Sequence, residues 1–212
     1  DGKVKTKTIV GSIDTSTFPS IAPSIQMTLK TPSHAGGPVP VIVYASAAFG
    51  GGGRGRGPAP AAGAAPAAVA ANVPATPANA ATPAPGGRGG GRGPAGPSLE
   101  DLTLAQGWGY ATFTTGSVQP DNAPGLTQGI IGLMNKGQER AKPDEWGVLM
   151  AWSWGLSKSI DYFESDQDVD AKQLAVDGFS RWGKTAVLAP APAQRWAIAW
   201  AGVSRQPGTK IN

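Results

Sequence analysis

The sequence offers its clearest chemistry at Gly178-Phe179-Ser180-Arg181-Trp182-Gly183-Lys184. A serine on a sharp turn between a strand and a helix exposes its hydroxyl, and backbone N–H groups at the helix start can hold a developing oxyanion. Arg181 and Lys184 add positive charge on the same turn and one helical turn later. A serine at such a turn is more often an ordinary helix N-cap. Arg181 and Lys184 can be solvated charges at the helix end, Lys184 can instead pair with a carboxylate, and Trp182 can line a pocket or lie in the core.

This motif requires a strand before it and a helix after it. The apolar run Leu174 to Val176 predicts a short buried strand, and Lys184 to Ala189 predicts a helix of small residues that ends before Pro190. Gly178 relieves crowding in the turn. The pattern departs from Gly-x-Ser-x-Gly because Trp182 occupies the second glycine position.

The rest of the chain alternates strand and helix patterns, which predicts an α/β sheet that is largely parallel. A periodic apolar stripe from Leu149 to Phe163 predicts an amphipathic helix packed on that sheet. Gly116 to Ala141 is predicted as loop and short helix, and the acidic run Asp166 to Asp170 as a solvated turn rather than a calcium loop. Further strands are predicted over Lys3 to Val10, Ser24 to Lys30, Val39 to Tyr44, Tyr110 to Thr115 and Trp196 to Ala201.

A low-complexity segment separates two parts of this pattern. Gly50 to Ser98 contains 15 Ala, 14 Gly, 9 Pro and four Arg with no acidic residue, so it is predicted to be a disordered loop insertion. Residues 1–49 then carry the N-terminal strands, and residues 99–212 continue the domain with the nucleophile turn. The Gly-Arg runs resemble those of some RNA-binding proteins, but a linker is preferred because no aromatic residue is interleaved for stacking.

Composition excludes several kinds of partner and site. The four arginines of the insertion account for the net charge of +4, so the remainder has no excess charge to attract a nucleic acid or an anionic membrane. No run of about 18 apolar residues could span a membrane. The chain contains no cysteine, which excludes disulfides and thiolate sites. No signal peptide is recognised at its start.

Gly178 to Lys184 resembles the Gly-x-Ser-Arg-x-Gly-Lys signature of the glucuronoyl esterases, carbohydrate esterase family 15. The resemblance continues through most of the chain outside the insertion, in Val39 to Gly51, Ala105 to Asp121, Trp146-Gly147, Ala151 to Ser157, Asp161-Tyr162 and Asp168 to Lys172.

The resemblance implies a three-layer α/β-hydrolase fold and a secreted or periplasmic bacterial serine esterase, monomeric and without metal or cofactor. The implied substrate is the ester between 4-O-methyl-glucuronic acid of glucuronoxylan and lignin alcohols. It also implies that Ser180 is the nucleophile, that Arg181 stabilises the oxyanion and that Lys184 binds sugar hydroxyls.

The chain departs from the family where a base and an acid are needed. Its one histidine, His34, precedes Ser180, whereas the hydrolase order is nucleophile, acid, histidine, so His34 is expected in a surface loop. Val203 stands where many members have a glutamate. The domain therefore looks truncated, the remainder of the polypeptide is expected to supply both groups, and the 212 residues alone are expected to be inactive. An acetyl or feruloyl xylan esterase and a non-catalytic carbohydrate-binding relative remain alternatives.

Overall fold

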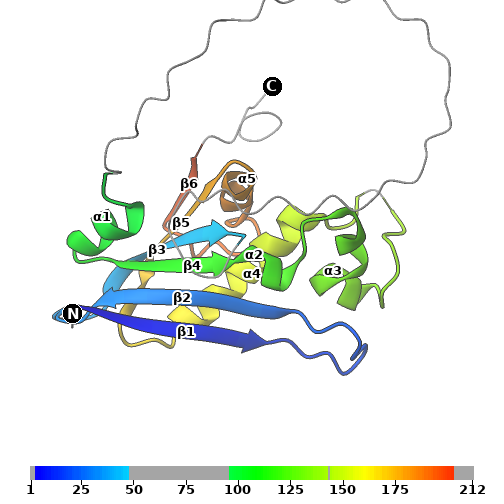
Figure 1. Cartoon of the computed structure of the whole chain (residues 1–212), viewed down its shortest axis with the longest axis horizontal. Coiled ribbons are helices and arrows are strands. Elements are labelled where there is room, and N and C mark those ends of the chain that lie inside the picture. Colours follow the sequence, from blue (N-terminus) through cyan, green and yellow to red (C-terminus); the bar gives the residue numbers. More distant parts are fainter. Residues whose placement is uncertain (1–2, 48–95, 143, 203–212) are drawn as a thin grey trace, which may run out of the picture. The chain divides into compact units, whose positions relative to one another are not determined.

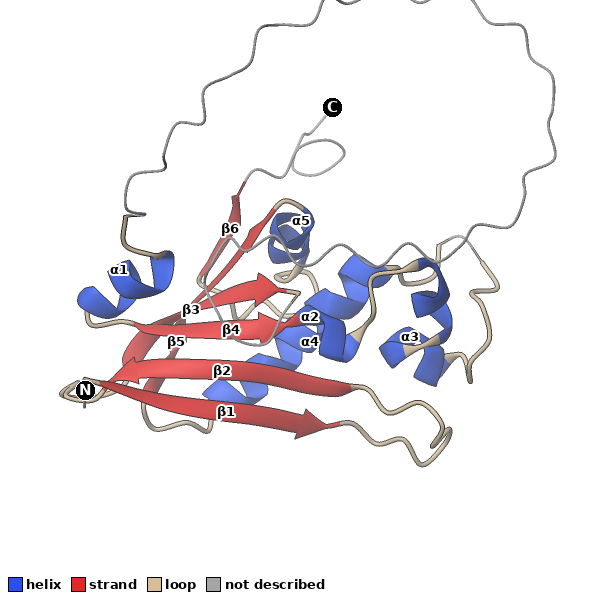
Figure 2. Ribbon diagram, in the orientation of Figure 1, coloured by secondary structure: helices blue, strands red, loops and turns tan. Residues whose placement is uncertain are grey.

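A mixed six-stranded sheet organises residues 3–47, 96–142 and 144–202, which are the residues described by the computed structural model (Figures 1 and 2). The strand order is β1-β2-β4-β3-β5-β6; β1 pairs antiparallel with β2 and β2 with β4, while the other pairs are parallel. The expectation of a largely parallel α/β sheet therefore holds for its centre and for β6. The strands are β1 (Val4–Ser12), β2 (Ser24–Pro32), β3 (Val39–Ser46), β4 (Gly109–Thr114), β5 (Val169–Phe179) and β6 (Ile198–Gly202).

Alternation along the central strands directs one side chain in two towards the main core. In β3 the buried residues Val39, Val41, Val43 and Ala45 alternate with half-exposed ones. Helices α4 (Val148–Phe163) and α5 (Arg181–Leu188) cover this face, and the stripe predicted from Leu149 to Phe163 supplies Leu156, Ile160 and Phe163 to the core. Every second side chain of the strands and the apolar stripe of α4 thus pack in the same core cluster.

The opposite face carries helix α1 (Leu99–Ala105), for which the sequence analysis predicted no element. A capping box begins the helix: the Ser98 Oγ accepts from the Asp101 N–H at 3.1 Å, and the Asp101 carboxylate accepts from the Ser98 N–H at 3.0 Å. Glu100 of α1 forms an ion pair with Lys30 of β2. These contacts place α1 over the β2 and β4 side of that face.

Two boundaries of the nucleophile region differ from those predicted. Strand β5 is 11 residues long rather than the three of Leu174 to Val176, because it also includes Val169, which pairs with Val39 of β3, and the polar residues at the register shift before Leu174. Helix α5 begins at Arg181 rather than at Lys184. The connection predicted as loop and short helix contains α2 (Thr115–Val118), the 3-10 helix η1 (Ala123–Thr127) and α3 (Gly129–Met134).

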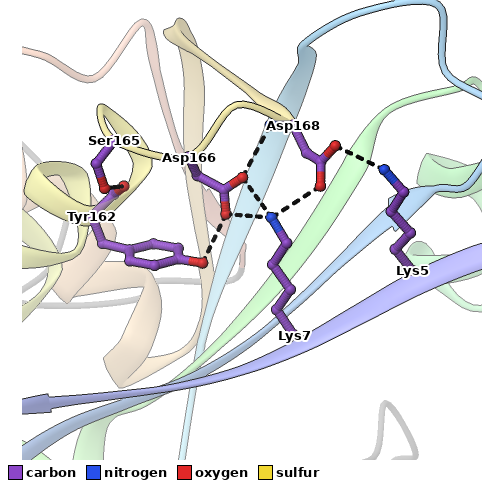
Figure 3. Close-up of polar contacts among 6 residues, drawn as sticks. All are labelled: Lys5, Lys7, Tyr162, Ser165, Asp166 and Asp168. Carbon is purple, nitrogen blue, oxygen red and sulfur yellow. Dashed lines mark hydrogen bonds and ion pairs between the residues drawn. The ribbon is translucent and has the colours of Figure 1, made fainter.

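The turn before β5 is joined to edge strand β1 by ion pairs (Figure 3). Lys7 Nζ lies 2.6 Å from Asp166 Oδ1 and 2.9 Å from Asp168 Oδ2, and Lys5 Nζ lies 2.9 Å from Asp168 Oδ1. The hydroxyl of Tyr162 donates to Asp166 Oδ2 at 2.7 Å. The side chain of Asp166 is 2% exposed, so the prediction of a solvated turn is wrong for this residue.

The charge of Asp166 is tolerated in that position because several donors compensate for the burial. Burial alone would raise the pKa of Asp166, but hydrogen bonds from Lys7, the Asp168 N–H and Tyr162 lower it below its usual value. The compensating lysine is 159 residues away in the sequence, so no local pattern could reveal it.

Candidate active site

The carboxyl ends of the parallel strands meet at one edge of the sheet, and Ser180 lies there. Ala45 near the end of β3 is in register with Gly178 of β5, and Ser46 is in register with Thr114 of β4. Helix α2 follows β4 directly, and Ser180 follows β5. In parallel α/β sheets this edge is where ligands bind.

Ser180 has a strained backbone and an exposed position, as expected of a nucleophile on a sharp turn. Its φ is 59° and its ψ is −116°, and Lys136 is the other non-glycine residue with positive φ in the described ranges. Such a conformation costs an L-residue about 1–3 kcal/mol and persists only where the surroundings impose it. Ser180 stands at the N-cap position, yet its side chain makes no capping hydrogen bond to α5. Ser180 is thus the N-cap residue by position, as one interpretation of the motif expected, but it does not cap the helix through its side chain.

Close backbone packing imposes this turn. A Cβ on Gly178 would lie 2.3 Å from the carbonyl oxygen of Trp182, so the start of α5 can approach β5 only because residue 178 has no side chain. The N–H of Ser180 donates to the carbonyl of Gly202 in β6 at 2.8 Å. Both neighbours of the turn, α5 and β6, thus hold the serine in place. The first N–H groups of α5 begin beside it and have no intrahelical acceptor.

The two basic residues of the motif differ in their surroundings. Arg181 is exposed, and its Nη1 forms an ion pair with Oδ2 of Asp121, which lies between α2 and η1. Lys184 is half-buried, one helical turn after Ser180. Within residues 3–47, 96–142 and 144–202 the Lys184 ammonium has no hydrogen-bond or ion-pair partner. Within those residues, Lys184 therefore takes part in no structural ion pair, and its ammonium is left available for a ligand.

Trp182 joins the turn to the end of β3. Its Nε1 donates to Thr115 Oγ1 at 3.1 Å, and Thr115 Oγ1 donates to the carbonyl of Ser46 at 3.0 Å. The ring packs against the edge of the hydrophobic core while remaining half-buried. The tryptophan in place of the second glycine therefore connects α5, α2 and β3.

The single histidine lies far from this edge. His34 is an exposed residue in the turn that follows β2, at the edge where β3 begins, as the sequence analysis expected. From Val39 to Ser46 the axis of β3 spans about 23 Å at roughly 3.3 Å per residue. His34 cannot accept the proton of Ser180 over that distance. Val203, the residue at the position of the family's glutamate, lies outside the described residues.

A buried carboxylate lies three residues before Ser180. Asp177 is 8% exposed and is in register with Tyr44 of β3, and the ring of Tyr44 stacks on Tyr110 with centroids 6.4 Å apart. Burial raises the pKa of Asp177, and a hydrogen bond from the Gly178 N–H lowers it by less. Because successive side chains of a strand point to opposite faces, this carboxylate faces away from the main core.

An apolar cavity of the described residues lies away from Ser180. It has a volume of about 470 Å³ and lies between α3 and the start of α4, lined by Ile131, Met134, Trp146 and Trp154 among others. The residues of the motif and this apolar cavity therefore occupy different places. The turn, and not the cavity, defines the candidate site.

Residues 102–211, more than half of the chain, match the sequence model of a family described as "Glucuronyl esterase, fungi". The chain belongs to this glucuronoyl esterase family. It is 39% identical over 111 residues to the carbohydrate esterase MZ0003 of an unknown prokaryotic organism, covering 51% of this chain and 25% of that protein. Over 55 residues it is 42% identical to the 4-O-methyl-glucuronoyl methylesterase of Neurospora crassa, covering 24% of this chain and 14% of the methylesterase.

Solved structures agree with the family assignment. The glucuronoyl esterase from Solibacter usitatus superimposes with a TM-score of 0.61 at 30% identity, covering 93% of this chain and 47% of that structure. The chain thus has the α/β-hydrolase fold of the glucuronoyl esterases, as the resemblance implied. It spans a quarter of the curated carbohydrate esterase and less than half of the Solibacter enzyme.

The sequence pattern predicted the turn but indicated no role for Asp121. That residue falls within the resemblance of Ala105 to Asp121, and nothing in its local pattern distinguishes it from an ordinary loop carboxylate. Its contact with Arg181 joins residues 60 positions apart and becomes visible only in three dimensions.

Proposed function

We propose that the intact protein is a serine esterase that hydrolyses the ester between 4-O-methyl-glucuronic acid of glucuronoxylan and lignin alcohols. One observation carries the proposal: Ser180 of the family signature occupies a strained turn at the carboxyl edge of the sheet without capping the helix after it. Serines placed in this way are the nucleophiles of α/β-hydrolases. The Neurospora relative, which is named for this activity, supports the choice of substrate.

In the proposed reaction the Ser180 Oγ attacks the carbonyl carbon of the uronate ester and loses its proton to a general base. The resulting oxyanion is stabilised by N–H groups at the start of α5 and by the guanidinium of Arg181. The tetrahedral intermediate then expels the alcohol, which takes a proton from the base. Water attacks the acyl-enzyme and releases the uronic acid.

Lys184 supports recognition of the sugar in this proposal. Its ammonium offers three donors one helical turn from the nucleophile, and a uronate ring carries several hydroxyl acceptors. His34 lies at the opposite edge, so the proposal assigns the base and its acid to the remainder of the polypeptide. No metal or cofactor takes part in the proposed steps.

The substrate also suggests where the protein works. Glucuronoxylan and lignin are cell-wall polymers, so we propose a secreted or periplasmic monomer. None of the helices that the structure describes is long and apolar enough to cross a membrane.

The test is Ser180→Ala in the intact protein, assayed on a benzyl ester of glucuronic acid. Removal of the nucleophile of such a unit typically lowers kcat about a million-fold. Binding of the free uronic acid, measured by calorimetry, should be retained, because alanine leaves the sugar contacts in place. Turnover within tenfold of the wild type would contradict the assignment of Ser180.

A further inference from the structure

The contact between Arg181 and Asp121 joins the residue after the nucleophile to a distant connection. Nη1 of Arg181 forms an ion pair with Oδ2 of Asp121, and the side chains are 54% and 39% exposed. Ion pairs with this degree of exposure contribute little to stability, because water and salt screen them. Stability therefore does not account for this ion pair, and its effect on the position of the Arg181 side chain is the alternative to consider.

The backbone that carries Asp121 is firmly anchored two residues earlier. Gln119 is fully buried, its Oε1 accepts from the N–H of Ile131 at 3.0 Å, and its Nε2 donates to the carbonyl of Gly125. The main-chain carbonyl of Gln119 accepts from the indole N–H of Trp152 at 2.8 Å. One buried residue thus ties this connection to α3, to η1 and to α4. A carboxylate extending from such a support has a defined position.

A second contact fixes the same two segments relative to each other. Trp182 donates to Thr115, which donates to Ser46 at the end of β3. Consecutive residues of the nucleophile turn, Arg181 and Trp182, are therefore both held by the segment from Thr115 to Asp121. This arrangement orients the first turn of α5 from outside the helix.

Given the proposed esterase function, we propose that Asp121 is a positioning residue that holds the guanidinium of Arg181 in place for the oxyanion. Asp121 engages Nη1, and a guanidinium has five N–H donors in a rigid fork, so donors remain to meet the substrate. An unrestrained arginine side chain samples many rotamers, which lowers the fraction of time that it spends facing the developing charge. A fixed partner removes that loss before the reaction begins.

The direct experiment compares Asp121→Ala and Asp121→Asn with the wild type of the intact protein on a benzyl glucuronate ester. We expect kcat to fall about tenfold to a hundredfold in the alanine variant, less than the loss from removing an oxyanion donor outright, which is about 10²–10³. KM should stay within about twofold, because the interaction concerns the transition state. The asparagine variant keeps a neutral hydrogen bond and should lose less.

The matched control is Asp161→Asn. Asp161 accepts from Arg195 at 2.7 Å in an ion pair of similar exposure, and α4 carries it towards the opposite edge of the sheet. This variant should keep the wild-type kcat and KM. Unchanged melting temperatures in both aspartate variants would separate positioning from a loss of fold.

A double-mutant cycle decides whether Asp121 acts through Arg181. In an Arg181→Gln background, Asp121→Ala should cause no further loss of kcat. Equal kcat in Asp121→Ala and the wild type, additive losses in the cycle, or a raised KM with unchanged kcat would each overturn the inference.

Failure of the proposed function would give a different pattern. In that case the wild type would not hydrolyse glucuronate esters or Ser180→Ala would retain turnover. The same comparison on p-nitrophenyl acetate, which needs an oxyanion site but presents no sugar, then tests the positioning role of Asp121 by itself. Loss of acetate turnover in Asp121→Ala supports that role, and unchanged turnover overturns it.

Discussion

Substitution of Gly178 by alanine should disturb both stability and catalysis. The new Cβ would lie 2.3 Å from the carbonyl oxygen and 2.4 Å from the carbonyl carbon of Trp182, and 2.8 Å from the nitrogen of Gly183. All three atoms belong to the backbone of α5, so no flexible side chain can move aside to relieve the overlap. The helix itself must move by about 1 Å for normal van der Waals contact, which is about 3.5 Å between heavy atoms.

The cost follows from this geometry. Overpacking of a well-packed interior typically costs about 1–3 kcal/mol, and a clash with rigid backbone belongs at the upper end. For a chain of this size about 3 kcal/mol corresponds to a fall in Tm of roughly 6–12 °C. A displacement of about 1 Å between Ser180 and its neighbours should also lower kcat about a hundredfold.

Thermal unfolding followed by circular dichroism, together with kcat on a glucuronate ester, provides the assay. Gly36→Ala is the matched control, since a Cβ at Gly36 has no neighbour within 4 Å and this turn lies at the other edge of the sheet. The control should change stability by no more than about 0.5 kcal/mol. If Gly178→Ala melts at the same temperature as Gly36→Ala and keeps wild-type kcat, the close-packing explanation of the turn is refuted.

Three further substitutions test other groups. Lys184→Ala should raise KM about tenfold for glucuronate esters and leave aryl acetates unaffected, because the lost hydrogen bonds act on the sugar in substrate and transition state alike; an equal loss on both substrates in steady-state assays would make Lys184 structural. Asp177→Asn should raise Tm at pH 7 by relieving a buried charge that costs about 1–3 kcal/mol, and because burial raises the folded-state pKa of Asp177, the gain should vanish as pH falls below the unfolded value of 3.8. Asp166→Asn should lower Tm at pH 7 through a loss of about 1–3 kcal/mol in the free energy of unfolding. Because the pKa of Asp166 is lowered in the folded state, the difference in Tm from the wild type should shrink as pH falls through this lowered pKa. Melting curves between pH 2 and pH 7 check both aspartate predictions, and a pH-independent difference would contradict either one.

The strand, turn and helix around Ser180 were predictable because their determinants are adjacent in the sequence. An apolar run, a glycine, a serine and a helix-forming segment follow one another, and their order alone specifies a strand, a turn and a helix. The apolar periodicity of α4 was equally informative, since a helix that covers a sheet must present one stripe to it. Helix α1 could also have been predicted from its signal, the capping box of Ser98 and Asp101.

Other features depend on partners that are remote in the sequence. The first half of β5 shows no strand pattern, and it is joined to β3 through the pair of Val169 with Val39. Burial of Asp166 depends on Lys7, and the orientation of Arg181 depends on Asp121. Each of these contacts joins segments at least 60 residues apart, so local propensity contains no information about them.

The strained serine has a consequence for protein engineering. The folded state retains Ser180 in a conformation that glycine would adopt with less strain, so at this position the fold is less stable than it could be. Selection for heat resistance alone would therefore tend to replace Ser180, the proposed nucleophile, while raising the melting temperature. Libraries built on this fold should therefore keep residue 180 unchanged or measure turnover as well as melting temperature. At this position we expect a substitution that raises stability to lower activity.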